Sequence, residues 1–378
     1  MVRSVLIALA VALSAVALAA GSAAPAHAAK GMEIGLQDDH AFVGETTLHR
    51  KTGLKLASRL HVTRIRVNLA WAHIVNRPRS KKQPGHRHYD FAAYDALYVA
   101  ARKRHIKLQL TISGPAPRWA TGNRKKVGNY KIKLDPFEHY VRAVIKHFRH
   151  KVDRYSVWNE PNFRTWNEPL KGNAERYRKM YSVAWKTIQK YDKHARVFIG
   201  ETSPYGKQGD STSPIKFLRR VAKGGKLRAD GYAHHPYDYK HGPRWPKTPD
   251  ANAAINNLGN LTDALDNLAK QKRLVTRHGK PLDLYLTEFG YMASGPYRKP
   301  ASTRAKFLPE AFQIALNNPR VKEMTQYLLA PPPPFGNDFD TSIVTKKGKP
   351  TKVFKALESW AKDRTKAHLV ATRPTAAR

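Results

Sequence analysis

Cysteine is absent from this chain of 378 residues. A disulfide framework and a zinc site built on cysteine are therefore both excluded. After Ala20, no stretch of the sequence is apolar for long enough to span a bilayer. A chain of this size buries enough apolar surface to fold without covalent cross-links.

Acidic residues are scarce, since 28 Asp and Glu stand against 68 Lys and Arg, which gives a formal net charge of +40. A field of this sign attracts polyanions, and uronic-acid polysaccharides, anionic cell-wall polymers and nucleic acid are the candidates. A generally basic surface that serves solubility explains the same count equally well. The lysines and arginines are scattered and do not alternate with aromatic residues in one patch, so no specific nucleic-acid partner is expected.

Residues 1–28 have the pattern of a secretory signal peptide. Arg3 supplies a positive charge, an apolar run extends from Val5 to about Ala20, and small residues lead to Ala26-His27-Ala28. This order of charge, apolar run and small-residue site is typical of a cleaved signal. We therefore expect cleavage near Ala28 and a secreted, extracellular chain with no membrane span. The alternative is an uncleaved N-terminal anchor.

The rest of the chain alternates short apolar or β-branched runs with longer helical segments, as in βαβ units with a parallel sheet. Eight units favour an α/β fold of the (β/α)8 TIM-barrel type, a single catalytic domain over residues 29–364. The remaining residues, 365–378, form a basic tail that we expect to be disordered. The expected strands are Met32–Gly35, Arg64–Asn68, Lys107–Ile112, Arg154–Val157, Arg196–Gly200, Gly231–His234, Asp283–Thr287 and Met324–Leu328. The expected helices include Phe91–Arg104, Pro136–Arg149, Ala174–Lys190, Ala253–Thr276, Pro309–Asn318 and Phe354–Lys362.

Two of the expected strands end in a glutamate. The fourth leads into Trp158-Asn159-Glu160-Pro161, and the seventh ends at Thr287-Glu288. Residues at the C-terminal ends of barrel strands point into the active-site mouth. Glycoside hydrolysis needs two carboxylates beside the scissile bond, one protonated and one ionised. The pair therefore predicts a glycoside hydrolase, and the alternative is two surface glutamates at loop starts.

These two motifs resemble those of the clan A glycoside hydrolases, in particular the cellulase-like family 5 and the β-xylosidase-like family 39. The resemblance implies that Glu160 is the acid/base, that Glu288 is the nucleophile, and that Asn159 binds the sugar 2-hydroxyl. It implies a retaining double displacement on a β-linked polysaccharide or oligosaccharide, with glucan, mannan and xylan all open. It implies no metal and no organic cofactor.

Four more residues fit the resemblance. Arg66 corresponds to the clan's strand-two arginine and would keep the nucleophile ionised; its alternative is a solvated or helix-pairing arginine. Tyr237 would donate a hydrogen bond to Glu288, and His235 would line the donor sugar site. Trp119, after the third strand, is predicted to be a sugar platform, with packing at the barrel rim as the alternative.

The resemblance has one departure, because the clan's strand-eight tryptophan is missing from Tyr327-Leu-Leu-Ala330. Tyr327, Phe335 and Phe339 are the candidates to replace it. The departure leaves open a catalytically impaired carbohydrate- or polyanion-binding protein on the same barrel. Retention of both glutamates argues against that alternative.

Three further polar features are expected to have no catalytic or metal-binding role. Glu201, after the fifth strand, is expected to lie in a loop turn and not to be a third carboxylate in the mouth. The His234-His235 pair, with Asp238 nearby, matches no strong zinc spacing. The basic loop of residues 76–88 is expected to be solvated.

Overall fold

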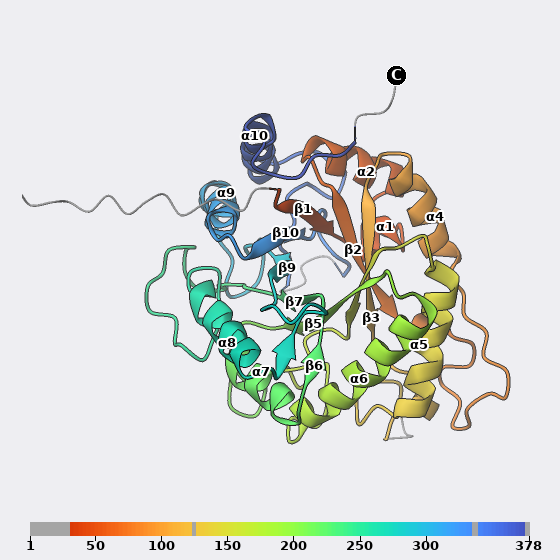
Figure 1. The fold of residues 1–378 in the computed structure, drawn as a ribbon. Helices are drawn as coiled ribbons and strands as arrows, with labels where there is room; N and C mark the ends of the chain where they lie inside the picture. Colours follow the sequence, from red (N-terminus) through yellow and green to blue (C-terminus); the bar gives the residue numbers. More distant parts are fainter. Residues whose placement is uncertain (1–30, 123–125, 335–338, 375–378) are drawn as a thin grey trace, which may run out of the picture.

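The computed structural model of the protein describes residues 31–122, 126–334 and 339–374 (Figure 1). The predicted signal segment, 1–28, and Phe335 lie outside the described residues. No helix within the described ranges is long and apolar enough to cross a membrane.

Eight parallel strands close into a barrel in the order β1-β10-β9-β7-β5-β4-β3-β2, and helices surround it (Figure 1). The predicted (β/α)8 barrel is therefore confirmed, and each of the eight expected strands overlaps an observed one. The barrel strands are β1 (Glu33–Gln37), β2 (Arg64–Ala70), β3 (Lys107–Ser113), β4 (Arg154–Val157), β5 (Arg196–Thr202), β7 (Gly231–His234), β9 (Leu284–Phe289) and β10 (Val321–Tyr327). A separate two-stranded sheet pairs β6 (Leu227–Arg228) with β8 (Leu274–Val275).

The helices alternate with the strands along the chain. They are α1 (Asp39–Phe42), α2 (Arg50–Arg59), α3 (Trp71–Ile74), α4 (Ala92–Arg102), α5 (Leu134–Phe148), α6 (Asn173–Tyr191), α7 (Pro214–Lys223), α8 (Leu258–Lys270), α9 (Ala301–Asn317) and α10 (Lys352–Lys366), with a 3-10 turn η1 (Arg118–Ala120). The prediction of one helix over 253–276 is wrong at both ends. Its start is a loop whose amides bond to other loops, as Ala253 N does to Pro204 O, and its end is strand β8. Pro309 lies inside α9 and does not begin it.

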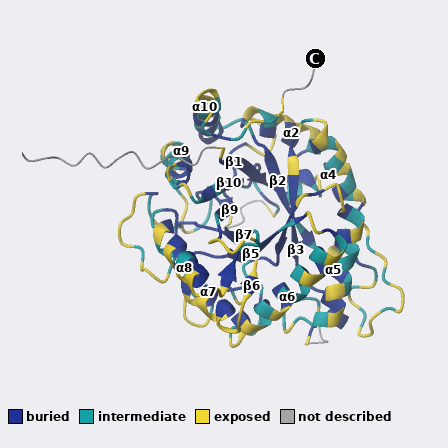
Figure 2. Ribbon diagram, viewed as in Figure 1, coloured by how far each residue is buried: buried dark blue, intermediate teal, exposed yellow. Residues whose placement is uncertain are grey.

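The main hydrophobic core lies between the outer face of the barrel and the helices. Helix α5 shows how the sequence produces it, because Phe137, Tyr140, Val141, Val144 and Phe148 recur at helical spacing and are all buried. In Figure 2 the strands and the inward sides of the helices are buried, while the outward sides of the helices are exposed.

The inside of the barrel is charged at its N-terminal end. Arg64 forms ion pairs with Glu33 (3.0 Å) and Asp153 (2.8 Å), and Arg154 forms ion pairs with Glu33 (2.6 Å) and Glu323. Burial raises the pKa of Glu33, but Arg154 and Arg64 outweigh it and bring that pKa to about 2. This network occupies the N-terminal end of the barrel.

The predicted disordered tail is corrected over its described part. Helix α10 continues through Lys366, past the expected end of the domain. Val370 then pairs with Met32, and the guanidinium of Arg373 donates to Ser58. Residues 365–374 therefore pack against the barrel, because their backbone and one arginine find partners there; residues 375–378 are not described.

Candidate active site

Carboxylates and an arginine meet at the C-terminal ends of the barrel strands. Glu160 lies three residues after the end of β4, Glu201 lies in β5, and Glu288 lies in β9. Glu160 and Glu201 both have left-handed backbone angles, with φ of 37° and 49°. Such angles cost about 1–3 kcal/mol for a residue with a side chain and are concentrated at functional sites. The fold therefore holds both glutamates in conformations that the local chain alone disfavours.

The two predicted catalytic carboxylates share one histidine nitrogen. His235 Nδ1 lies 3.0 Å from Glu160 Oε1 and 3.6 Å from Glu288 Oε2. One oxygen of each carboxyl group therefore lies within 3.6 Å of the same nitrogen, which brings the two groups close together. This contact favours the separation of about 5–5.5 Å found in retaining glycosidases over the wider gap, about 6.5–9.5 Å, of inverting ones.

Glu288 is fixed through both of its oxygens. Arg66 donates to Oε1 at 2.6 Å, and the hydroxyl of Tyr237 donates to Oε2 at 3.2 Å. The other amino group of Arg66 donates to Asn159 Oδ1 at 3.0 Å, which turns the amide NH2 of Asn159 away from the arginine. Arg66 therefore orients the nucleophile candidate and the amide expected at the sugar 2-hydroxyl together.

The site shifts the pKa values of two of its carboxyl groups, Glu160 and Glu201, in opposite directions. Burial raises the pKa of Glu160, and the neighbouring His235 offsets only part of this rise. Burial also raises the pKa of Glu201, but Arg66 and His235 outweigh it and bring that pKa to about 2. Burial lowers the pKa of His235, but its three carboxylate neighbours, Glu288 first, raise it to about 9. Glu160, whose pKa is raised, thus stands beside a histidine whose pKa is also raised and beside the ion pair between Arg66 and Glu288.

The structure brings together Glu160, Glu288, Asn159, Arg66, His235 and Tyr237, as expected from the sequence. The reading of Glu201 as a loop residue is wrong. Its side chain is 0% exposed, and its Oε2 accepts hydrogen bonds from Arg66, His235 and Thr287.

Trp119 does not stand as a sugar platform. It is 2% exposed, its ring meets that of Trp71 edge-on at 5.8 Å, and its Nε1 donates to Arg77 O. The loop after β3 folds back onto the barrel rim, so neither face of the indole is open to a substrate.

Sequence reasoning missed Gln37 and Asp39. Gln37 is buried at the end of β1 and accepts a hydrogen bond from Arg66. Asp39 accepts from the backbone N (2.9 Å) and side-chain Nδ2 (3.0 Å) of Asn68, and burial raises its pKa. The signal was present, because Gln37-Asp38-Asp39 is a polar run directly after a strand, like the two that were recognised.

An aromatic wall, defined here as Tyr237, Tyr239, Tyr327 and Phe339, stands beside Glu288. The Phe339 ring lies edge-on to the rings of Tyr237 (5.4 Å), Tyr239 (6.1 Å) and Tyr327 (5.8 Å). Phe339 is 37% exposed, whereas Tyr237 is fully buried. Phe339 is therefore the member of this wall that offers most of its surface to a ligand.

The histidine pair divides into two roles. His234 bonds to Thr202 Oγ1 (2.8 Å) and Ala253 O (2.7 Å), and burial lowers its pKa to about 3, so it is a neutral core residue. His235 belongs to the carboxylate cluster. Among the described residues, no group of three or more His, Asp or Glu is arranged to hold a metal ion.

The sequence pattern of glycosyl hydrolase family 1 matches residues 37–189, less than half of the chain. No curated protein matches the chain in sequence. The family match ends before β9, so it includes Glu160 and not Glu288.

Several solved glycoside hydrolases share the fold. A family 39 glycoside hydrolase from Bacteroides cellulosilyticus aligns with a TM-score of 0.65 and 18% identity over 88% of this chain and 64% of its own. This chain therefore spans less than two thirds of that enzyme. A family 39 β-xylosidase from Caulobacter crescentus aligns with a TM-score of 0.60 and 18% identity, over 87% of this chain and 71% of its own. Thermotoga maritima Cel5A aligns with a TM-score of 0.56 and 14% identity, over 88% of this chain and 100% of its own.

The family match and the shared fold confirm the predicted resemblance to the clan A glycoside hydrolases. They also support the predicted enzyme class, a glycoside hydrolase. The matching sequence pattern is that of family 1, whereas the motifs alone resemble families 5 and 39. At identities this low the solved structures establish the fold alone.

Proposed function

We propose that this protein is a retaining β-glycosidase that cleaves O-glycosidic bonds of a polysaccharide or oligosaccharide by double displacement. The observation that carries the proposal is the contact of one nitrogen, His235 Nδ1, with the carboxylates of both Glu160 and Glu288. The pair combines a close approach with one acid whose pKa is raised by burial and one carboxylate held by an arginine, which suits the retaining mechanism.

In the first step a carboxylate oxygen of Glu288 attacks the anomeric carbon. The bond from that carbon to the leaving oxygen breaks, and the proton of Glu160 passes to the leaving oxygen, so the leaving group departs as an alcohol. Arg66 and Tyr237 fix the attacking carboxylate, and the Asn159 amide is placed to donate to the sugar 2-hydroxyl.

In the second step a water oxygen attacks the same anomeric carbon. Ionised Glu160 accepts the water proton, the ester bond to Glu288 breaks, and Glu288 returns to the carboxylate form. Two inversions at one carbon give net retention of configuration. Glu160 ends protonated, ready for the next cycle.

The aromatic wall supplies a sugar-binding face in place of the missing strand-eight tryptophan. We expect Phe339→Ala to lower kcat/KM on oligosaccharides about three- to tenfold, since an aromatic contact contributes roughly 0.5–1.5 kcal/mol. Steady-state kinetics on the same substrate measure this, with Tyr297→Ala as a control at another exposed ring that contacts Tyr239 but not Phe339. Equal effects of the two variants would contradict a specific role for Phe339.

Two loops at the mouth form what we call the basic lip. It consists of five cations from residues 76–88, after β2, and two from the loop after β3. Neither loop, 76–88 or 114–133, contains an acidic residue, although the whole chain has 28. We propose that the lip favours anionic polymers as substrates. Its residues are Arg77, Arg79, Lys81, Lys82, Arg87, Lys126 and Lys131.

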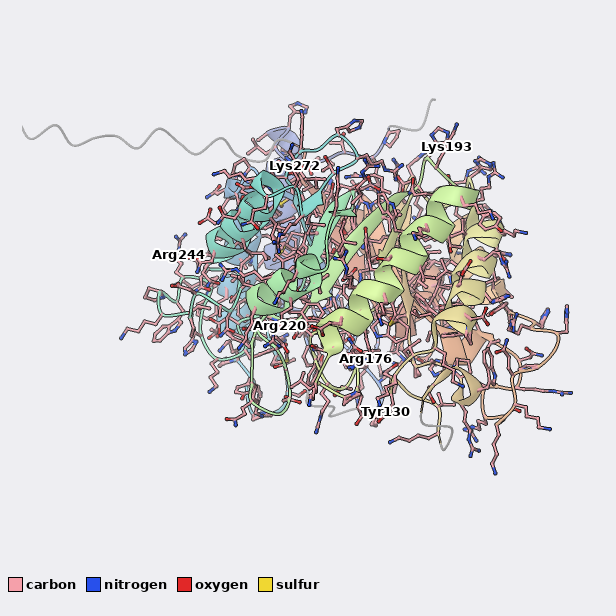
Figure 3. The ribbon with its side chains drawn as sticks, turned by 60° about the horizontal axis from the view of Figure 1, so that its bottom comes forward. Tyr130, Arg176, Lys193, Arg220, Arg244 and Lys272 are labelled. Carbon is pink, nitrogen blue, oxygen red and sulfur yellow. The ribbon has the colours of Figure 1, made fainter. Side chains whose placement is uncertain are left out.

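Removing charge from the basic lip provides the test. We expect Arg79→Gln/Lys82→Gln to raise KM for a uronic-acid polymer roughly three- to tenfold at low salt and to leave KM for a neutral glucan unchanged. The matched control is Lys193→Gln/Lys272→Gln, which removes two exposed charges from the opposite end of the molecule from Tyr130 and Arg176 (Figure 3). The same effect in both double variants would mean that net charge, and not the lip, attracts the polymer.

We further propose that the protein is secreted and that its signal segment is cleaved near Ala28. The support is the order of charge, apolar run and small residues in the sequence. N-terminal sequencing of protein from the culture medium should begin close to Ala29; intact Met1 in the medium would contradict cleavage.

The catalytic proposal is tested by turnover on a panel of aryl β-glycosides with soluble β-glucan, mannan, xylan and uronic-acid polymers. We expect hydrolysis of at least one member with retention at the anomeric carbon, followed by NMR as product forms. Binding without turnover on every member would favour the alternative, a carbohydrate- or polyanion-binding protein on the same barrel.

A further inference from the structure

A third carboxylate, Glu201, lies behind the two that the proposed reaction uses. Its Oε2 accepts three hydrogen bonds, from Arg66 Nη2 (3.1 Å), His235 Nε2 (2.8 Å) and Thr287 Oγ1 (2.6 Å). Its side chain is fully buried, so none of its surface is exposed to contact a substrate. A buried carboxylate in a left-handed backbone conformation is costly, and only its charged and hydrogen-bonding partners offset that cost.

The partners of Glu201 are the residues that hold the reacting pair. Arg66, from β2, bridges Glu201 and Glu288. His235, after β7, bridges Glu201 through Nε2 and Glu160 through Nδ1. Glu201 therefore reaches each of the two proposed catalytic carboxylates through one cationic side chain.

The geometry points to Glu201 as a positioning residue that keeps His235 in the imidazolium form, with its Nδ1 proton directed at Glu160 and Glu288. This inference rests on the proposed glycosidase function. A neutral imidazole presents a proton on only one nitrogen, whereas the imidazolium donates from both. Each ring nitrogen faces a carboxyl oxygen, Glu201 Oε2 at Nε2 and Glu160 Oε1 at Nδ1, so the doubly protonated form donates in both contacts.

The surroundings of His235 support this charge state. The two cations, Arg66 and His235, face the two carboxylates Glu201 and Glu288, which leaves the buried Glu160 as the neutral acid. When Glu160 has given up its proton to the leaving group, the imidazolium at 3.0 Å stabilises the resulting carboxylate until it accepts a proton from water. The charged and titratable groups that surround His235 and Glu201 are Arg66, Glu160, Tyr177, His234, Tyr237, Tyr239 and Glu288.

The sign of the pH effect follows from the charge count. The active form carries the carboxyl proton of Glu160 and both ring protons of His235. Removal of the negative charge of Glu201 makes the cluster more positive, so it loses its first proton at a lower pH, whichever residue supplies that proton. The alkaline limb of the kcat/KM profile should therefore move toward acid in Glu201→Gln.

The test compares wild type with Glu201→Gln, Glu201→Asp and Glu323→Gln. We expect the alkaline limb of Glu201→Gln to shift down by about one pH unit or more. Glu201→Asp retains the charge, so its limb should stay near that of wild type even if its rate falls. Glu323 is a buried carboxylate paired with Arg154, and removing it should leave the limb unmoved. A rate loss in Glu201→Gln with an unmoved limb would overturn the proposal.

A second measurement is independent of turnover. The side chain of His235 is followed by ¹⁵N NMR in wild type and Glu201→Gln, and its signal is assigned with His235→Gln. We expect both ring nitrogens to be protonated at pH 7 in wild type, and the titration midpoint to fall by about one unit or more in Glu201→Gln. A neutral His235 in wild type, or equal midpoints, would overturn the inference even if the glycosidase proposal holds. If no substrate is turned over, the glycosidase proposal fails separately, and the NMR midpoints still decide this one.

Discussion

Glu288→Ala should lose at least about 10⁴-fold in kcat on an aryl β-glycoside, because alanine removes the carboxylate that attacks the anomeric carbon in the proposed reaction. Added azide enters the space left by the carboxylate and attacks in its place. One inversion then occurs instead of two, and the product is the α-glycosyl azide. Product NMR identifies the anomer.

Glu160→Ala should behave differently with the same reagent. A good leaving group needs little protonation, so the first step survives and the glycosyl-enzyme accumulates. Azide then attacks this intermediate and gives the β-glycosyl azide, with turnover recovered from a loss of about 10²–10⁴-fold. Asn162→Ala, at a buried residue that bonds only to loop backbone, is the control and should show no azide effect. The same azide anomer from both glutamate variants would contradict the assigned roles.

Arg154→Met should lower the free energy of unfolding by about 3–5 kcal/mol, because it removes the cation that pairs with the buried carboxyl group of Glu323 and with Glu33. Glu323 is 0% exposed, and Arg154 is its ion-pair partner among the described residues. Urea unfolding followed by tryptophan fluorescence measures the change.

The double variant Arg154→Met/Glu323→Gln separates charge from packing. Glutamine needs no cation, so the double variant should recover a large part of the lost stability. If it is no more stable than Arg154→Met, the loss comes from the volume of the arginine, and the ion pair contributes little.

The fold and half of the site follow from a simple rule about parallel barrels. Parallel barrel strands all end at the same edge of the barrel. A glutamate shortly after β4 and another near the end of β9 are therefore expected to lie close together. Strand alternation puts Arg66 on the same face of β2 as Arg64, and in the structure both point inside the barrel. The local sequence pattern is enough to predict these residues, because the arrangement of parallel strands in a barrel brings their C-terminal ends together.

Other residues were predicted wrongly for physical reasons. Glu201 was read as a loop residue because β5 was expected to end at Gly200, although it extends to Thr202. The prediction that Trp119 is a sugar platform was wrong because the path of the loop after β3 decides whether the indole is exposed. The sequence alone does not give that path. The pairing of Arg154 with Glu323 joins residues 169 positions apart, and alternation shows only that each points inward.

The central claim, that Glu288 is the nucleophile of a double displacement, is tested most directly by trapping the intermediate. Wild type is treated with an activated 2-deoxy-2-fluoro-β-glycoside of the sugar that it turns over, and the digested protein is analysed by mass spectrometry. The account predicts one added fluoroglycosyl group on the peptide that contains Glu288, with loss of activity in step with labelling. A label on Glu160 or Glu201, or unlabelled enzyme that releases product of inverted configuration, would contradict it.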